Sequence, residues 1–215
     1  MSDANDEDGG SRRGYHHGNL REALMKAALD LITEKGASGF TFAEAARAAG
    51  VSPAAPYRHY RDRDALLADV ARRGFEQLEA RLQAARAKGG VSPARALDAL
   101  ARSYLEFARR EPAQFSAMYE SGLALASYPE MRDASARVFD VVREACAAVI
   151  EAMPEGKRPP AMMMALHVWS MVHGMAALFG RGDGGRRPIP MNIDDLVDAA
   201  LLIYLAGVGG ETNDG

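Results

Sequence analysis

The sequence predicts an all-α protein of about nine helices, in which a small N-terminal helix-turn-helix domain precedes a larger helical domain. Three observations support this. Ala, Leu, Arg and Glu dominate the 215-residue chain, and β-branched residues are sparse. Apolar residues recur at helical spacing, and no alternating run is long enough for a strand. Gly and Pro lie mostly at the ends of these segments, where helices stop and start.

The first helix is expected from Leu20 to Lys35. Its apolar residues, from Leu20 to Ile32, form one stripe at helical spacing. Asn19 is the expected N-cap, and Gly36 ends the helix. Residues 1–11 are acidic and show no periodicity, so we expect a disordered tail there.

Residues 41–60 (TFAEAARAAGVSPAAPYRHY) predict two short helices joined by a tight turn. Thr41 and Glu44 have the spacing of a capping box, in which each side chain binds a backbone N–H at the other residue. Gly50 ends the first helix, because glycine adopts the left-handed conformation without strain. Ser52 and Pro53 suit the start of the second helix. The stretch therefore predicts a helix-turn-helix unit.

The second of these helices carries groups that can bind DNA. Small side chains at its start allow a close approach to base edges, and hydroxyl, guanidinium and imidazole groups follow. The candidate DNA-binding residues are Thr41, Ser52, Pro53, Ala54, Ala55, Tyr57, Arg58, His59, Tyr60 and Arg63. Arg58 is the candidate for direct base readout. Two alternatives stay open, namely that Tyr57 packs against the first helix and that His59 is an ordinary surface residue.

Charge is unevenly distributed along the chain. The net charge of the whole chain is −3, but residues 1–10 carry −4 and residues 11–75 carry +4. The positive block coincides with the helix-turn-helix unit and favours a polyanionic partner. Just before the first helix, a basic and aromatic arm is expected to contact phosphates or the minor groove through Arg12, Arg13, Tyr15 and His16. The alternative for this arm is a solvated tail.

Further helices are expected along the rest of the chain. Asp62 suits the N-cap of a long helix that runs to about Ala87 and spans about 35 Å. Others are expected at 93–110, from 112, at 129–152, at 161–180 and from 193, with linkers at 153–160 and 180–190. We interpret the long helix as the mechanical link between the two domains.

Residues 161–180 (AMMMALHVWSMVHGMAALFG) are apolar over the length of a membrane span. His167, Ser170 and His173 interrupt the segment, however, and no partner helix accompanies it. A helix that is apolar on nearly all sides is also expected when two of its faces are buried. We therefore favour a helix that packs on its own domain with one face and on a second subunit with the other, and we predict no membrane association.

The N-terminal part of the chain resembles the TetR family of transcriptional regulators. The resemblance covers about residues 12–70 and rests on the A-x-x-x-G-V turn that ends at Val51, the run from Tyr57 to Arg63, and the preceding helix NLREALMKAALDLITEKG. Trp169, His173 and Gly174 also resemble the W-x-x-x-H-G signature of one TetR subgroup. One departure is Pro56, where the wider family usually has Ile or Leu.

The resemblance implies a homodimer that forms through the last two long helices, about 161–180 and 193–207. A dimer would place its two recognition helices about 34 Å apart and would require a palindromic operator in double-stranded DNA. The implied domains are a tail at 1–11, a DNA-binding domain at 12–62, an effector-binding and dimerisation domain at 63–208, and a tail at 209–215. We expect a repressor that a small-molecule effector releases. An activator or a helix-turn-helix scaffold without ligand control is the alternative.

An effector cavity between helices would be lined by aromatic and Met side chains with a few polar groups. The candidate ligand-binding residues are Tyr104, Phe107, Phe115, Met118, Tyr119, Met163, Trp169 and His173. The alternative for each of them is an ordinary core position.

Other functional classes find little support in the sequence. The single Cys146 excludes an internal disulfide and a cysteine-based zinc site, and we expect it in the core. The histidines lack metal-ligand spacing with carboxylates. No phosphate-binding G-x-x-x-x-G-K-[ST] or nucleophile G-x-S-x-G motif occurs. We therefore expect no enzyme, metal or cofactor. The acidic, polar N-terminus does not resemble a signal peptide, so a cytoplasmic location is expected.

Overall fold

The computed structural model describes residues 20–90, 92–179 and 192–209, and the expectations for residues 1–19 and 180–191 fall outside these ranges. Within them the chain forms eight α-helices, three short 3-10 helices and no strand, which confirms the all-α prediction. The α-helices are α1 (Leu20–Lys35), α2 (Phe42–Ala48), α3 (Arg63–Lys88), α4 (Pro93–Arg110), α5 (Pro112–Tyr119), α6 (Pro129–Glu151), α7 (Ala161–Phe179) and α8 (Ile193–Gly209). The 3-10 helices are η1 (Ala55–Arg58), η2 (Leu125–Ser127) and η3 (Glu155–Lys157).

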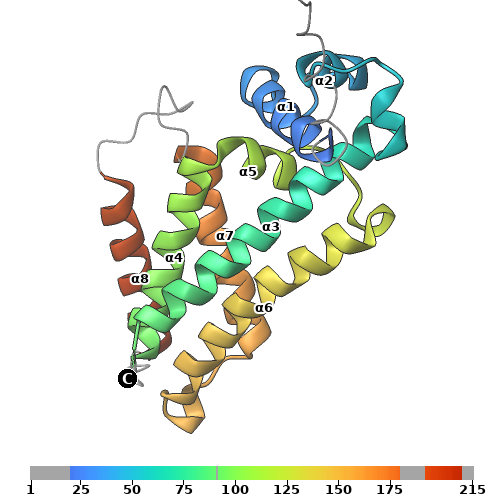
Figure 1. Cartoon of the computed structure of the whole chain (residues 1–215). Helices are drawn as coiled ribbons and strands as arrows, with labels where there is room; N and C mark the ends of the chain where they lie inside the picture. The colour runs from blue at the N-terminus through green and yellow to red at the C-terminus, as the bar shows by residue number, and fades with distance from the viewer. Residues whose placement is uncertain (1–19, 91, 180–191, 210–215) are drawn as a thin grey trace, which may run out of the picture.

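Helix α3 runs through the middle of the molecule and connects its two parts (Figure 1). The Asp62 side chain caps it as expected and accepts a hydrogen bond from the Ala65 backbone N–H at 2.7 Å. One end of α3 packs on α1, and the rest packs on α4, α5 and α6. Its apolar face, which includes Leu66, Phe75 and Leu82, is fully buried. The orientation of the small N-terminal unit therefore depends on this helix and on α5, which α1 also contacts.

The N-terminal unit consists of α1, α2 and η1, and its α1 packs on both α3 and α5. Leu24, Ala28 and Ile32 of the predicted α1 stripe are buried, together with Phe40 and Ala45 from the segment that follows. Gly36 ends α1 with a φ of +79°, a conformation that glycine adopts without strain.

The second helix of the helix-turn-helix unit differs from the prediction. Only the 3-10 helix η1 forms, and the Ser52 side chain does not cap it. Pro56 has no N–H to donate to the Ser52 carbonyl four residues back, and that carbonyl instead accepts from the Ala55 N–H at 3.0 Å. Proline at position 56 therefore removes the bond that an α-helix would make here.

The larger part of the molecule is a bundle in which α4, α5 and α6 pack on α3, and α7 packs on α4 and α6. Helix α7 is long and apolar enough to cross a membrane by length and composition. In this fold, Met164, Val168 and Val172 bury one of its faces against α4 and α6. Helix α8 packs at the edge of the bundle, on α4 and α7.

Candidate functional site

The first helix of the candidate DNA-binding unit is held by the predicted capping box. The Thr41 side chain accepts from the Glu44 backbone N–H at 3.2 Å, and Glu44 Oε2 accepts from the Thr41 N–H at 2.8 Å. Lys35 Nζ, at the end of α1, lies 2.8 Å from Glu44 Oε1. The Lys35 hydrogen bond and those from Thr41 lower the pKa of Glu44 to about 2. The capping box therefore fixes the start of α2, and the Lys35 ion pair connects it to the end of α1.

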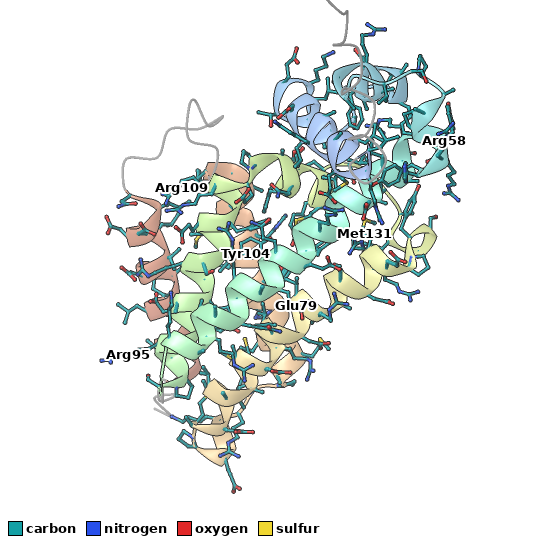
Figure 2. The ribbon with its side chains drawn as sticks, in the orientation of Figure 1. Arg58, Glu79, Arg95, Tyr104, Arg109 and Met131 are labelled. Atoms are coloured by element: carbon teal, nitrogen blue, oxygen red, sulfur yellow. The ribbon has the colours of Figure 1, made fainter. Side chains whose placement is uncertain are left out.

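The η1 turn presents three polar side chains to solvent. The Tyr57 side chain is 62% exposed, and its ring meets Phe42 of α2 edge-on at 5.1 Å between centroids. Arg58 and His59 are exposed, and neither side chain has a partner among the described residues. Arg58 lies at the outer edge of the unit, far from Arg95 at the opposite end of the molecule (Figure 2). This surface is free to meet an extended partner.

Two of the predicted DNA contacts need correction, because the structure uses them internally. The Tyr60 side chain is buried and donates a hydrogen bond to Asp69. Arg63 Nε donates to the Phe40 carbonyl at 2.9 Å, and a second nitrogen of the same side chain donates to the Ala37 carbonyl. Arg63 thus holds the turn between α1 and α2. Neither side chain is available to bind a phosphate in this arrangement.

The remaining candidates divide into two groups. Ser52, Pro53 and Ala54 are exposed beside η1, and Ala55 is half-buried. The arm residues Arg12, Arg13, Tyr15 and His16 lie outside the described residues.

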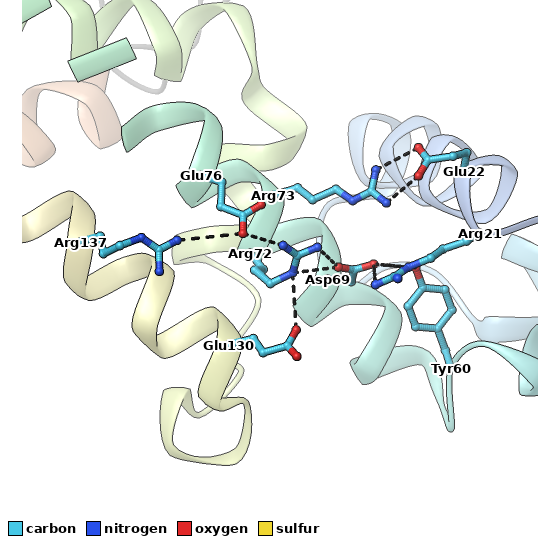
Figure 3. A network of polar contacts seen from close by, with 9 residues as sticks. All are labelled: Arg21, Glu22, Tyr60, Asp69, Arg72, Arg73, Glu76, Glu130 and Arg137. Carbon is cyan, nitrogen blue, oxygen red and sulfur yellow. Dashed lines mark hydrogen bonds and ion pairs between the residues drawn. The ribbon is translucent and has the colours of Figure 1, made fainter. Parts of the chain in front are cut away.

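A polar network connects the N-terminal unit to the bundle, and its centre is Asp69 of α3 (Figure 3). Asp69 Oδ2 accepts from the Tyr60 hydroxyl at 2.7 Å and from Arg21 Nη2 at 2.9 Å. Its other oxygen accepts from Arg72 at 2.6 Å. Burial opposes ionisation of Asp69, but the hydrogen bonds from Tyr60, Arg72 and Arg21 hold its pKa below the usual value. Asp69 is therefore a buried carboxylate with three donors.

The network continues from Arg72 to α6. Arg72 lies 2.6 Å from Glu76 and 3.8 Å from Glu130 at the start of α6, and Arg137 of α6 lies 4.0 Å from Glu76. Sequence reasoning missed the network. The signal available was an acidic residue, Asp69, inside the otherwise apolar run LLADVA.

Five of the eight candidate ligand-binding residues form one aromatic cluster between α4, α5 and α7. The Tyr119 ring lies 4.9 Å from Phe115 and 4.7 Å from His173, and the Trp169 ring lies 5.6 Å from Tyr104. The Tyr104 hydroxyl lies 2.8 Å from His173 Nδ1, within hydrogen-bond distance. Burial lowers the pKa of His173, which favours its neutral form.

The other three candidates lie elsewhere. Phe107 is buried beneath Arg81, whose guanidinium carbon lies 5.6 Å from the centre of the ring. Met118 packs toward α3, where a Cβ added to Gly74 would lie 2.6 Å from its sulfur. Met163 is 46% exposed on α7. Its prediction as a cavity residue is wrong for this arrangement, because a helix turns about 100° per residue and Met164, its neighbour, takes the buried position.

The aromatic cluster contains an unsatisfied polar atom. The Tyr119 hydroxyl is buried and, within residues 20–90, 92–179 and 192–209, is the one buried side-chain nitrogen or oxygen without a hydrogen-bond partner. Leaving such a group unpaired costs about 1–3 kcal/mol. The adjoining cavity, lined by Tyr104, Trp169 and four aliphatic side chains, has a volume of about 10 Å³. That is room for one water molecule at most.

Among the described residues, no three His, Cys, Asp or Glu side chains lie close enough together to hold a metal ion.

Two family models match the chain. Residues 24–70 match the model described as "Bacterial regulatory proteins, tetR family". Residues 97–203 match the model described as "Tetracyclin repressor-like, C-terminal domain". No match was found among curated protein sequences.

Solved structures share the fold over nearly the whole chain. A protein of unknown function from Rhodococcus sp. RHA1 is 30% identical, with a TM-score of 0.75 over 93% of this chain and 100% of that one. The TetR family transcriptional regulator PfmR from Thermus thermophilus is 22% identical, with a TM-score of 0.67 over 85% of this chain and 96% of that one. The ketosteroid transcriptional regulator KstR2 of Mycobacterium tuberculosis is 19% identical, with a TM-score of 0.65 over 93% of this chain and 100% of that one.

Proposed function

This chain belongs to the TetR family of bacterial regulatory proteins, and we propose that it is a homodimeric repressor that a small-molecule effector releases from a palindromic operator. It is a DNA-binding transcriptional regulator. In this proposal, residues 12–62 form the DNA-binding domain, and residues 63–208 hold the effector site and the dimer interface. The protein acts in the cytoplasm and catalyses no reaction.

The observation that carries the DNA-binding proposal is the free surface around η1. Tyr57, Arg58 and His59 point to solvent from a turn that the capping box and the Phe42 ring hold in place. Donors of this kind bind phosphates and base edges. Arg58 reads a base, while Tyr57, His59 and the Thr41 end of α2 contact the DNA backbone. The arm residues Arg12, Arg13, Tyr15 and His16 add contacts beside them.

The dimer interface of the proposal lies on the outer faces of α7 and α8. Large apolar side chains that are about half or more exposed gather there, namely Met162, Met163, Leu166, Leu178, Leu202 and Ile203. Exposed apolar area of this kind marks an interaction site. A second copy of the chain would cover it and would set the spacing of the two η1 turns.

Release by an effector requires that the effector bind one inter-domain arrangement more tightly than the other. Helix α3 transmits the change, because it carries the N-terminal unit at one end and packs on α4, α5 and α6 along the rest of its length. The Asp69 network holds α1, α3 and α6 in the arrangement seen here.

The proposal is tested by selecting bound DNA from a random pool and measuring affinity for the selected site. Arg58→Ala is expected to weaken binding by about 1–3 kcal/mol and to relax the preference at one base position. Arg95→Ala is the matched control, because it removes an exposed arginine at the far end of the molecule (Figure 2).

Several outcomes would contradict the proposal. Wild-type affinity that barely changes with salt concentration would exclude phosphate binding. Selection of no DNA by a folded dimer would favour a protein-binding scaffold. Increased transcription from a promoter that carries the selected site would favour an activator.

A further inference from the structure

The aromatic cluster also indicates what kind of effector the protein binds. We propose that the effector is an uncharged, planar molecule of about two fused rings, with a hydrogen-bond acceptor that the Tyr119 hydroxyl recognises. This inference rests on the proposed function, in which the bundle senses a small molecule. Three features of the cluster support it, namely its charge, its shape and the unpaired hydroxyl.

The charge of the cluster favours a neutral ligand. Its five rings are those of Tyr104, Phe115, Tyr119, Trp169 and His173, with Phe139 of α6 beside Trp169. Burial lowers the pKa of His173 and so favours the neutral histidine. An ionised ligand placed here would lose its hydration without gaining an opposite charge inside the cluster. The acidic side chain whose charge acts on His173, by raising its pKa, is Glu120. Glu120 is exposed and accepts a hydrogen bond from Ser116 at 2.8 Å. An anion would be repelled by it.

The shape of the cluster favours a planar ligand. The cavity of about 10 Å³ admits no organic molecule, so a ligand must displace a side chain. Trp169 is the side chain that a ligand would displace, because it is only half-buried. Its indole fills the space between Tyr104, Phe139 and Tyr119. A flat ring system of similar size can make the same edge-to-face contacts after the indole moves out.

The Tyr119 hydroxyl supplies the polar recognition. It is buried among rings and makes no hydrogen bond, although the Tyr104 side chain lies close enough to influence its pKa. The Tyr104 hydroxyl itself is paired with His173. A ligand acceptor placed against Tyr119 would pair a donor that the closed cluster leaves unpaired. Selectivity for ligands with such an acceptor is therefore expected, because ligands without it leave the donor unpaired.

Four probes of matched size separate these alternatives. They share the naphthalene ring and differ at position 2, which carries a methyl ketone, an isopropenyl group, a carboxylate or an amidinium group. The first two are neutral, with and without an acceptor, and the others carry one negative and one positive charge. Binding is measured by titration calorimetry with the full-length protein. The site is identified by NMR, because the single tryptophan, Trp169, gives one indole N–H signal.

The ketone is expected to bind about tenfold more tightly than the isopropenyl probe, which corresponds to about 1.4 kcal/mol. It is also expected to bind more tightly than either charged probe and to shift the Trp169 signal. Tyr119→Phe should fold with equal or greater stability and should bind the ketone and isopropenyl probes equally. Tyr204→Phe is the control, because it makes the same change on α8, where the hydroxyl lies 3.3 Å from His167.

The inference is overturned if a charged probe binds most tightly or if the wild type binds the two neutral probes equally. It is also overturned if the Trp169 signal does not move, or if no probe binds at about millimolar concentration, the weak end of useful affinity. DNA binding is measured on the same preparations without any probe. If the probe-free protein binds no DNA, the proposed function is contradicted, whereas intact DNA binding with a failed probe series contradicts only the effector class.

Discussion

At the scale of single residues, the most consequential side chain is Asp69. It is 7% exposed and accepts hydrogen bonds from Tyr60, Arg21 and Arg72, which come from three different parts of the chain. A buried carboxylate is stable only when donors replace the water that it has lost. Tyr60, expected at the DNA, is one of these donors, and burial together with the Asp69 hydrogen bond raises its pKa to about 12.

Asp69→Asn is expected to lower the free energy of unfolding by about 2 kcal/mol, because the two arginines lose the buried charge that they share. It should also weaken DNA binding, because α1 is then held less firmly on α3. Urea unfolding and a gel-shift titration measure the two effects. Asp133→Asn is the control, since Asp133 is 58% exposed and pairs with its neighbour Arg132. Equal effects of the two substitutions would contradict the role given to Asp69.

The same carboxylate predicts a dependence on pH. The pKa of Asp69 is lower in the folded protein than in the unfolded chain. The contribution of its charge to the free energy of unfolding is therefore complete above about pH 5 and is lost as the pH falls through the folded-state pKa. The difference in unfolding free energy between wild type and Asp69→Asn should therefore shrink from pH 7 to pH 3. A constant difference would show that the charge of Asp69 is not involved.

At the scale of elements, the caps decide where the DNA-binding unit lies. Helix α2 has only seven residues, so it cannot be stable by itself. The Thr41 and Glu44 capping box and the Lys35 contact hold it. The turn η1 has no side-chain cap and depends on Phe42 and the buried Pro56 instead. A substitution that unfolds α2 would therefore displace η1 as well.

Thr41→Ala is expected to cost about 1 kcal/mol of stability, because the N-cap oxygen is lost. Thr33→Ala makes the same change on α1, where the hydroxyl donates to the Leu29 carbonyl of its own helix at 2.9 Å. Alanine is the better helix former, so this control should be neutral or slightly stabilising. Thermal unfolding compares the two. Similar losses would mean that the capping box adds nothing to α2.

At the scale of the whole molecule, the proposed function requires two copies of the chain. A single η1 turn offers few contacts, and avidity from a second copy raises affinity without any new contact type. The apolar faces of α7 and α8 are the surface available for this, and Leu202 and Ile203 are 71% and 72% exposed there. Burying such side chains contributes about 1.5–3 kcal/mol each.

Replacing both Leu202 and Ile203 by Glu is expected to give a folded monomer whose operator affinity falls about a hundredfold or more. Sedimentation and gel shift provide the measurements. Leu125→Glu is the control, because Leu125 is also exposed, at 42%, but lies in η2 away from α7 and α8. A double variant that remains dimeric would place the interface elsewhere.

The sequence by itself determined most of the helices and their ends, although the second helix of the helix-turn-helix unit formed only the 3-10 helix η1. Periodicity, caps and Gly or Pro stops are local, so α1, the start of α3 and the capping box of α2 agree with the prediction. The tertiary structure decided which polar side chains are free. Tyr60 and Tyr57 are both tyrosines in one short run, yet one is buried on Asp69 and the other is exposed. That difference depends on residues far away in the chain, such as Asp69 and Arg21, whose positions local spacing does not contain.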